Sequence, residues 1–224
     1  PPNRSGAELW RGPVAGADAV AAALAAARAA QPAWEAAGLA ARIGVLERFR
    51  DHVRANAEAL AALIARETGK PLWEARSEAA SVVAKVDISI AAHAERTPTR
   101  LHPDGRALRH RPHGVLAVLG PYNFPAHLPN GHIVPALLAG NAVLLKPSEH
   151  TPAVGAWMAE AWAAAGLPPG LLAVLQGGPE TGRLLAAADI DGLLFTGSAR
   201  GGQALARHFA ETPWRILALE MGGN

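Results

Sequence analysis

Hydrophobic and polar positions in the first hundred residues recur with the period of α-helices. The pattern predicts one helix over residues 18–30, which Pro32 would disrupt, and a second over residues 39–67. A third helix is predicted over residues 71–95, where the leading proline is favourable in the first turn. We therefore expect residues 1–98 to form a helical segment that packs on the remainder of the chain.

A polar segment with a turn signal follows these helices. Residues 99–112 carry the sequence Pro103-Asp104-Gly105 between flanks rich in arginine and histidine. This combination is typical of a tight turn, so the segment predicts a β-hairpin. Because both faces of the hairpin would be polar, we expect residues 99–113 to protrude as an arm and not to lie in the core.

From residue 114 onward, apolar runs of strand length alternate with helical stretches. The runs are Val115–Leu119, Ala142–Leu145, Leu171–Leu175, Leu193–Phe195 and Ile216–Leu219. Strands that are apolar on both faces are typical of a parallel sheet covered by helices on both sides. The sequence therefore predicts an α/β fold in which residues 114–224 form a doubly wound, mainly parallel, five-stranded Rossmann-like sheet.

The composition excludes several classes of protein. Half of the 224 residues are hydrophobic and 18% are charged, which is typical of a globular chain and not of a disordered one. The net charge of +2 is small and the sequence has no basic block, so we expect no nucleic-acid partner. The apolar run at 19–27 is too short to span a membrane, so we expect no membrane partner either.

The sequence contains no cysteine, which excludes disulfides, thiolate metal sites and a cysteine nucleophile within these 224 residues. The absence fits a reducing compartment, and we expect a soluble protein of the cytoplasm. The histidines do not have the spacing of a metal site. His127 and His132 are five residues apart, and His110 and His113 have no carboxylate beside them, so we expect no bound metal.

Polar or glycine-rich sequence follows each of the predicted strands. Ligands of a doubly wound sheet bind beyond the carboxyl ends of its strands, so these segments are the candidate site. The segments are residues 120–125, 146–149, 176–182, 196–202 and 220–224. Their clustering indicates a ligand site better than any one of them does.

Lys146 and Glu149 follow the second predicted strand, three residues apart. Most such pairs are solvated ion pairs on the surface. In the crevice of a doubly wound sheet, an ammonium and a carboxylate could instead hold both hydroxyls of a ribose. A carboxylate at this place also repels a 2′-phosphate, which favours NAD over NADP.

Gly197 and Ser198 come directly before a predicted helix. They could form only a capping turn, or the exposed amides at the helix N-terminus could hold a pyrophosphate. Gly201 and Gly202 would then permit close approach of the backbone. No GxGxxG motif is present, and the stretch 177–182 is equally consistent with a simple turn.

Asn123 and Glu220 carry the candidate catalytic groups. Asn123 lies between two prolines, where it could serve a turn or aim its amide at a developing oxyanion. Glu220 lies at the end of a strand that we expect to be buried. Burial would raise the pKa of its carboxyl group toward that of a general base.

Four motifs occur in a fixed order and spacing among these segments. They are PYNFP at 121–125, KPSE at 146–149, FTGS at 195–198 and LEMGGN at 219–224. With these motifs the chain resembles the aldehyde dehydrogenase superfamily from near its N-terminus to its last residue. Most of that superfamily has tryptophan at the position of Tyr122 and lysine at the position of Asn224. Both departures are shared by the N-succinylglutamate 5-semialdehyde dehydrogenases of bacterial arginine catabolism, which this chain resembles in more detail.

The resemblance implies a role for each matching position. Asn123 would supply the side-chain amide of an oxyanion hole, and Glu220 would be the general base that activates the deacylating water. Lys146 and Glu149 would bind the adenosine ribose of NAD. The other contacts to the cofactor would come from Tyr122, Gly197, Ser198, Ala199, Arg200, Gly201 and Gly202.

The implied reaction is the NAD-dependent oxidation of a small aldehyde to a carboxylic acid, with N-succinylglutamate 5-semialdehyde as the favoured substrate. The family's nucleophile is a cysteine beyond the glutamate, in a catalytic domain absent from these residues, so we expect the isolated chain to be inactive. The hairpin would join copies of the protein in a homo-oligomer. Two alternatives remain open: a dehydrogenase for another semialdehyde, and a stand-alone dinucleotide-binding module without catalysis.

Overall fold

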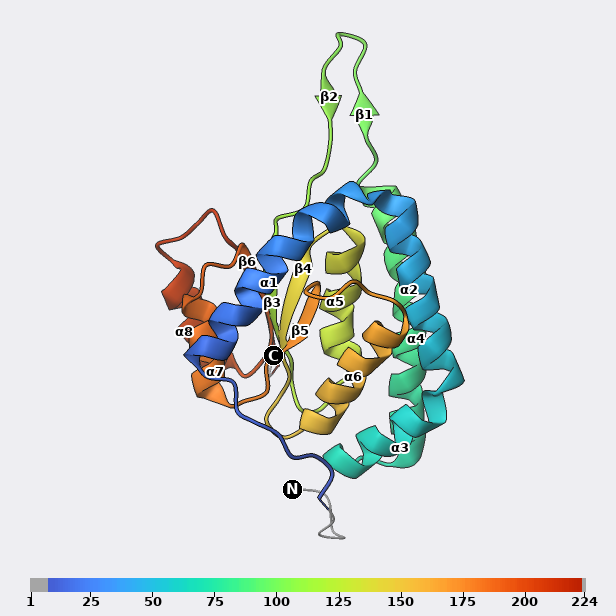
Figure 1. Cartoon of the computed structure of the whole chain (residues 1–224), viewed down its shortest axis with the longest axis vertical. Coiled ribbons are helices and arrows are strands. Elements are labelled where there is room, and N and C mark those ends of the chain that lie inside the picture. Colours follow the sequence, from blue (N-terminus) through green and yellow to red (C-terminus); the bar gives the residue numbers. More distant parts are fainter. Residues whose placement is uncertain (1–7, 223–224) are drawn as a thin grey trace.

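A five-stranded parallel sheet forms the centre of the computed structural model, which describes residues 8–222 (Figure 1). The strand order is β5-β4-β3-β6-β7. The strands are β3 (Val115–Leu119), β4 (Ala142–Lys146), β5 (Leu172–Val174), β6 (Gly192–Gly197) and β7 (Ile216–Met221). The predicted α/β fold is confirmed, and each predicted strand overlaps an observed one.

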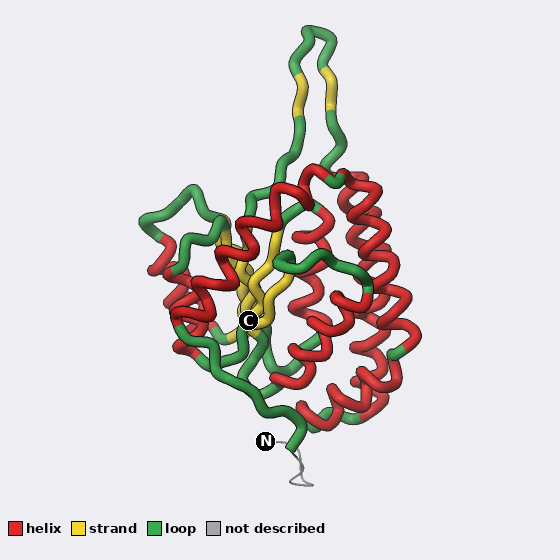
Figure 2. The backbone as a smooth tube through the Cα atoms, viewed as in Figure 1, coloured by secondary structure: helices red, strands yellow, loops and turns green. Residues whose placement is uncertain are grey.

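Helices cover both faces of this sheet (Figure 2). One face carries α5 (His127–Leu138) and α6 (Pro152–Ala164), and the other carries α1 (Ala17–Ala36), α7 (Pro179–Ala187) and α8 (Ala199–Phe209). An outer layer of α2 (Gly38–Ala55), α3 (Ala57–Thr68) and α4 (Leu72–Arg96) packs against α5 and α6. Within residues 8–222, no helix is both long enough and apolar enough to cross a membrane.

The core follows from the apolar strands and from the inner faces of the helices. All residues of β3 and β4 are buried, as both-sided coverage of a parallel sheet requires. The outer layer is joined to the inner one by aromatic packing, because the rings of Phe49 on α2 and Trp162 on α6 stack at a centroid distance of 3.7 Å. The helical segment and the sheet therefore share one core.

Two predicted helix boundaries are wrong. Pro32 does not end the first helix, which continues to Ala36, because Trp34 beyond the proline is buried and its indole donates to the Leu137 carbonyl at 2.8 Å. The helix predicted over 39–67 is broken at Asn56, whose backbone leaves helical geometry (φ −112°, ψ 16°). The Asn56 side chain donates to the His52 carbonyl at 2.8 Å and so competes with the backbone ladder.

The polar segment after α4 forms the expected hairpin. β1 (Arg100–Leu101) pairs antiparallel with β2 (Ala107–Leu108), and Gly105 takes a positive φ of 84° in the turn between them. Both strands are exposed, and Figure 1 shows the hairpin projecting away from the body of the molecule. Its role in joining copies of the protein stays a prediction.

The connections of the sheet define where a ligand can bind. From central β3 the chain passes to β4 and β5 on one side, and then crosses back to β6 and β7 on the other side. The strand order therefore reverses between β3 and β6, which is the topological switch point of such a sheet. The register places Lys146 opposite Leu119, and Glu220 opposite Thr196, at the same carboxyl edge.

Candidate active site

Lys146 is the last residue of β4 and is buried, with 6% of its surface exposed. Its ammonium donates to the carbonyls of Pro147 and Gly177, both at 2.8 Å, and lies 3.5 Å from the Glu149 carboxylate. Burial lowers the pKa of Lys146, while the Glu149 charge acts to raise it. The pair is therefore not the solvated ion pair that surface charges usually form, because its lysine is held inside the fold.

Glu149 offers its carboxylate to solvent at the mouth of this site. Its side chain is exposed, and it follows the buried end of β4 by three residues. Partial burial acts to raise the pKa of Glu149, but its own backbone amide and the Lys146 ammonium lower it below its usual value. The result is an ionised carboxylate beside a fixed ammonium, which is an arrangement that can accept and donate hydrogen bonds to a diol.

Ser198 caps α8, and its hydroxyl oxygen accepts from the Gly201 amide at 3.2 Å. The capping interpretation is therefore confirmed for this residue. The amides of Ala199 and Arg200 make no hydrogen bond within the described part of the chain, and both residues are exposed. Free amides at a helix N-terminus attract anions, so capping and phosphate binding are compatible at this turn.

The glycines of this turn have a packing role that sequence analysis did not find. A Cβ atom at Gly197 would overlap the ring of Phe195, and one at Gly202 would overlap the sulfur of Met221. Gly202 is buried where α8 crosses β7. A side chain at either position would have to displace the end of the Phe195 or Met221 side chain, so the two glycines favour close packing here apart from any approach of a cofactor.

Asn123 lies in the loop between β3 and α5, and its side chain makes no hydrogen bond to any residue in the range 8–222. Its backbone carbonyl accepts from the ammonium of Lys70 at 2.6 Å. A pocket of about 450 Å³ opens beside the loop, and it is lined by Thr68, Gly69, Lys70, Pro71, Glu74, Tyr122, Asn123 and Phe124. The Asn123 amide is thus free to donate to a ligand in front of the loop.

Tyr122 is 60% exposed, and its ring makes an edge-on contact with His150 at a centroid distance of 6.1 Å. His150 directly follows Glu149 in the chain. The contact therefore brings the loop after β3 to the segment after β4, which are two of the segments expected to form the cofactor site. No described contact joins Tyr122 to the turn at Gly197.

Glu220 is exposed, and the expectation that its carboxylate is buried is wrong. Its side chain is 59% exposed because β7 is the edge strand of the sheet and has a neighbour on one side only. The nearest titratable partner is His132 on α5, whose Nε2 lies 3.9 Å from the Glu220 carboxylate and 3.4 Å from the Thr196 hydroxyl. Burial lowers the pKa of His132, while Glu220 acts to raise it.

Asn123 and Glu220 lie at the same edge of the sheet but share no direct contact within residues 8–222. Asn123 follows the end of β3, and Glu220 lies near the end of β7. Strand β6 lies between these two strands in the sheet. Helix α5 connects the two positions, because it begins just after Asn123 and its residue His132 lies beside Glu220. Gly223 and Asn224 of the LEMGGN motif lie outside the described residues.

Two buried glutamates were missed by sequence analysis. Glu67 at the end of α3 accepts from the amides of Ala153 and Val154, at 2.9 and 2.8 Å, where α6 begins. Glu78 on α4 accepts from the amides at the start of α5. The signal was a carboxylate on an otherwise apolar helix face, since Glu67 lies one turn after Ile64. Both residues fix a helix that begins at the candidate site.

We expect the stability of the chain to carry a pH dependence that comes from Glu67. Burial raises the pKa of this carboxyl group, although its two amide hydrogen bonds act to lower it. The contribution of Glu67 to the free energy of unfolding is therefore greatest at pH values below the ordinary carboxyl pKa, and falls as pH rises through the raised pKa. Urea unfolding of the wild type and of Glu67→Gln from about pH 4 to pH 7 measures it. Identical pH dependence in the two proteins would refute this assignment.

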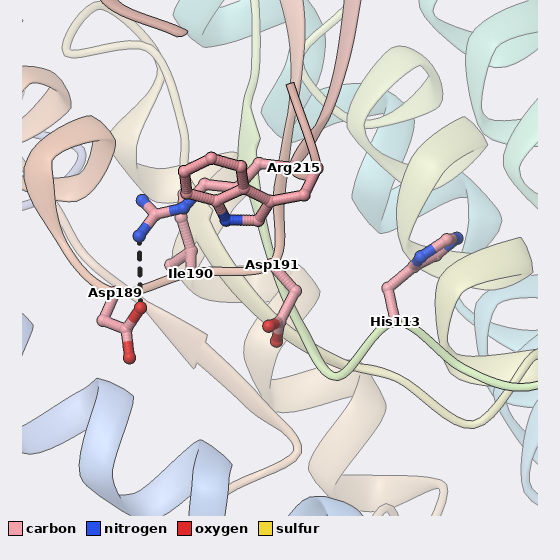
Figure 3. Close-up of a pocket in the computed structure, with 6 residues that line it drawn as sticks. His113, Asp189, Ile190, Asp191 and Arg215 are labelled. Atoms are coloured by element: carbon pink, nitrogen blue, oxygen red, sulfur yellow. Dashed lines mark hydrogen bonds and ion pairs between the residues drawn. The ribbon is translucent and has the colours of Figure 1, made fainter. Parts of the chain in front are cut away.

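The part of the chain that the structure describes holds no cluster of three or more His, Cys, Asp or Glu side chains arranged as a metal site. A second pocket, of about 140 Å³, lies at the opposite edge of the sheet and is lined by His113, Asp189, Ile190, Asp191, Trp214 and Arg215 (Figure 3). Asp191 there accepts from Arg28 and from the Val115 amide, and Arg215 pairs with Asp189 at 3.1 Å. These contacts tie the amino ends of the strands together.

Comparisons with known proteins identify relatives of similar sequence and solved structures of similar fold. An N-succinylglutamate 5-semialdehyde dehydrogenase of Sphingopyxis alaskensis is 60% identical over 98% of this chain and 46% of that protein. One of Novosphingobium aromaticivorans is 59% identical over 98% of the chain and 47% of that protein. The crystal structure of lactaldehyde dehydrogenase from Escherichia coli has a TM-score of 0.87 at 32% identity, covering 94% of this chain and 45% of that one.

The chain spans about half the length of the curated relatives it matches. The model of the aldehyde dehydrogenase family matches residues 2–224, which is nearly the whole chain. All four motifs on which the resemblance rests lie within that match. The chain therefore belongs to the aldehyde dehydrogenase family.

Proposed function

We propose that the full-length protein containing this chain oxidises N-succinylglutamate 5-semialdehyde to N-succinylglutamate, with NAD as the hydride acceptor. One observation carries the proposal: Asn123, Lys146, the Ser198 turn and Glu220 all lie at the carboxyl edge of one doubly wound sheet. The substrate is supported by the relatives at 59% and 60% identity, which are named for this activity.

Members of this family generally depend on NAD or NADP. The residues of this chain fit such a dinucleotide, because a buried ammonium and an ionised carboxylate stand side by side at Lys146 and Glu149. The free amides of Ala199 and Arg200 suit a pyrophosphate. When bound, the nicotinamide supplies the hydride chemistry, and these side chains hold the adenosine end.

The reacting end of the substrate would lie beside Asn123 and Glu220. The Asn123 amide, which has no hydrogen bond within the described residues, would donate to the oxygen that gains negative charge as a thiolate attacks the aldehyde. The exposed Glu220 carboxylate would accept a proton from the water that releases the acid. The thiolate must come from outside these 224 residues, because they contain no cysteine.

The absence of a cysteine nucleophile from these residues is also the basis of an alternative function without catalysis. A stand-alone dinucleotide-binding module would need the Lys146 and Ser198 segments but neither Asn123 nor Glu220. A dehydrogenase for another semialdehyde would need all of them. We also propose that the hairpin of residues 99–113 joins copies of the chain in a homo-oligomer, because an exposed two-stranded arm suits such a contact. We propose a cytoplasmic location for the protein as well.

An assay of the full-length protein separates these possibilities. We expect NADH formation with N-succinylglutamate 5-semialdehyde, with a higher kcat/KM than with lactaldehyde or succinate semialdehyde. A higher kcat/KM with another semialdehyde would replace the substrate and keep the chemistry. Binding of NAD without NADH formation from any aldehyde would sink the dehydrogenase proposal.

Substitutions at the ribose site test the choice of cofactor. We expect Lys146→Met to weaken NAD binding by about one order of magnitude, because hydrogen bonds to a charged donor are lost.

Glu149→Gln should raise the affinity for NADP relative to NAD, because it removes the charge that repels a 2′-phosphate. Isothermal titration of the full-length protein measures both effects. Glu160→Gln, an exposed carboxylate on α6, is the matched control; equal effects of Glu149→Gln and Glu160→Gln would contradict the assignment.

A further inference from the structure

The Asn123 loop is held by two side chains of the N-terminal helical segment. Lys70 lies between α3 and α4, and its side chain is only 8% exposed. Its ammonium donates to the Asn123 carbonyl at 2.6 Å and to the Glu78 carboxylate at 2.8 Å. It also lies 3.9 Å from the centroid of the Phe124 ring, a cation–π contact. Lys70 therefore contacts both the loop residue that carries the candidate amide and the residue after it.

Glu78 fixes the other end of the same loop. Its side chain is fully buried, and its Oε1 accepts from the amides of Ala126 and His127, at 3.0 and 3.1 Å. Its Oε2 accepts from Lys70. Both carboxylate oxygens are thus occupied. The loop is attached at the Asn123 carbonyl and again three residues later.

Lys70 and Glu78 form a buried pair of opposite charges. A buried carboxylate without a partner is strongly destabilising, and here Lys70 and two amides supply its partners. Glu74 adds a second carboxylate 3.7 Å from the Lys70 ammonium, at the rim of the 450 Å³ pocket. Such a network has few alternative arrangements, so it gives the backbone at Asn123 a defined position.

We propose that Lys70 and Glu78 are positioning residues for Asn123, which they hold so that its side-chain amide meets the developing oxyanion. An oxyanion donor is effective only when it is fixed before the reaction, and a displacement of about 1 Å can cost about two orders of magnitude in rate. The inference rests on the proposed dehydrogenase function. It deepens that function, because it assigns a rate effect to residues outside the cofactor edge of the sheet.

The cofactor site offers an internal comparison. Lys146 and the Ser198 turn belong to β4 and α8, and neither contacts Lys70 or Glu78 through a hydrogen bond. A positioning role for Lys70 therefore lowers kcat and leaves NAD affinity unchanged. General loosening of the fold would change both together.

The test uses the full-length protein with Lys70→Met. We expect the rate of the first turnover, followed as the NADH burst, and kcat to fall by about 10- to 100-fold. The Kd for NAD should stay within about twofold of the wild type. Lys70→Arg should recover much of the rate, because a guanidinium can still donate to both oxygens. The matched control is Arg76→Met on α4, which removes an exposed ion pair to Glu58 on α3 and should leave kcat unchanged.

A double-mutant cycle identifies the residue through which Lys70 acts. In an Asn123→Ala background, Lys70→Met should cost little further rate, because the group it positions is already gone. Glu78→Gln is the second variant if Lys70→Met does not fold, with the same expected non-additivity. Fully additive losses, or a parallel loss of NAD affinity, would overturn the inference. A slow Asn123→Ala variant beside a normal Lys70→Met variant would overturn it while leaving the proposed function intact; an inactive wild type would overturn both.

Discussion

Replacing Asn123 with alanine should lower kcat of the full-length protein by about 10²- to 10³-fold, while the Kd for NAD stays unchanged. The size follows from the loss of one preorganised donor to a developing oxyanion. Within residues 8–222 the Asn123 side chain makes no hydrogen bond, so alanine removes a functional group and little folding energy. Stopped-flow measurement of the first turnover isolates the chemical step from product release.

Asn123→Asp sharpens this test. Aspartate has the shape of asparagine but cannot donate when ionised, and its charge opposes an oxyanion. We expect it to be at least as slow as the alanine variant, with thermal unfolding close to that of the wild type. Near-normal turnover by Asn123→Asp would show that amide donation is not the role of this residue.

Replacing Glu220 with glutamine should separate the two halves of the reaction. The first hydride transfer does not need a base for water, so we expect a burst of about one NADH per active site. Steady-state turnover should then fall by about 10²- to 10⁴-fold, which is the usual contribution of a general base. Rapid-mixing measurement of burst amplitude and steady-state rate in one trace gives both quantities.

Glu211→Gln is the matched control for this variant. Glu211 is an exposed carboxylate in the loop before β7, remote from the carboxyl edge of the sheet. Its replacement should leave burst and steady state unchanged. Loss of the burst in Glu220→Gln would place Glu220 in the first half of the reaction, and an unchanged steady state would remove it from catalysis.

The strands were predictable because each carries its own signal. A run such as Val115–Leu119 is apolar at every position, and a parallel sheet covered on both faces buries such a run completely. The location of the polar segments after the strands was also predictable. All strands of a parallel sheet point the same way, so the segments that follow them meet at one edge. Helix boundaries were less predictable. The continuation of α1 past Pro32 depends on Trp34 reaching the Leu137 carbonyl, more than a hundred residues away.

The parts of the site that sequence analysis missed depend on distant contacts. Lys70 lies between two helices and Glu78 lies on a helix, and nothing in the sequence connects them with Asn123. Only the packing of the helical segment against α5 brings them to the Asn123 loop. The burial assigned to Glu220 was wrong because strand order, which periodicity does not give, places β7 at an edge. Glu67 shows the general signal that can be used: a carboxylate on an apolar helix face needs buried donors, and helix N-termini supply them.

A crystal structure of the full-length protein with NAD bound tests the proposed site most directly. We expect the adenosine ribose within hydrogen-bonding distance of Lys146 and Glu149, and the pyrophosphate against the free amide of Ala199. Asn123 and Glu220 should then flank the nicotinamide ring. A dinucleotide bound instead at the pocket formed by the amino ends of the strands would contradict both the cofactor site and the catalytic roles built on it.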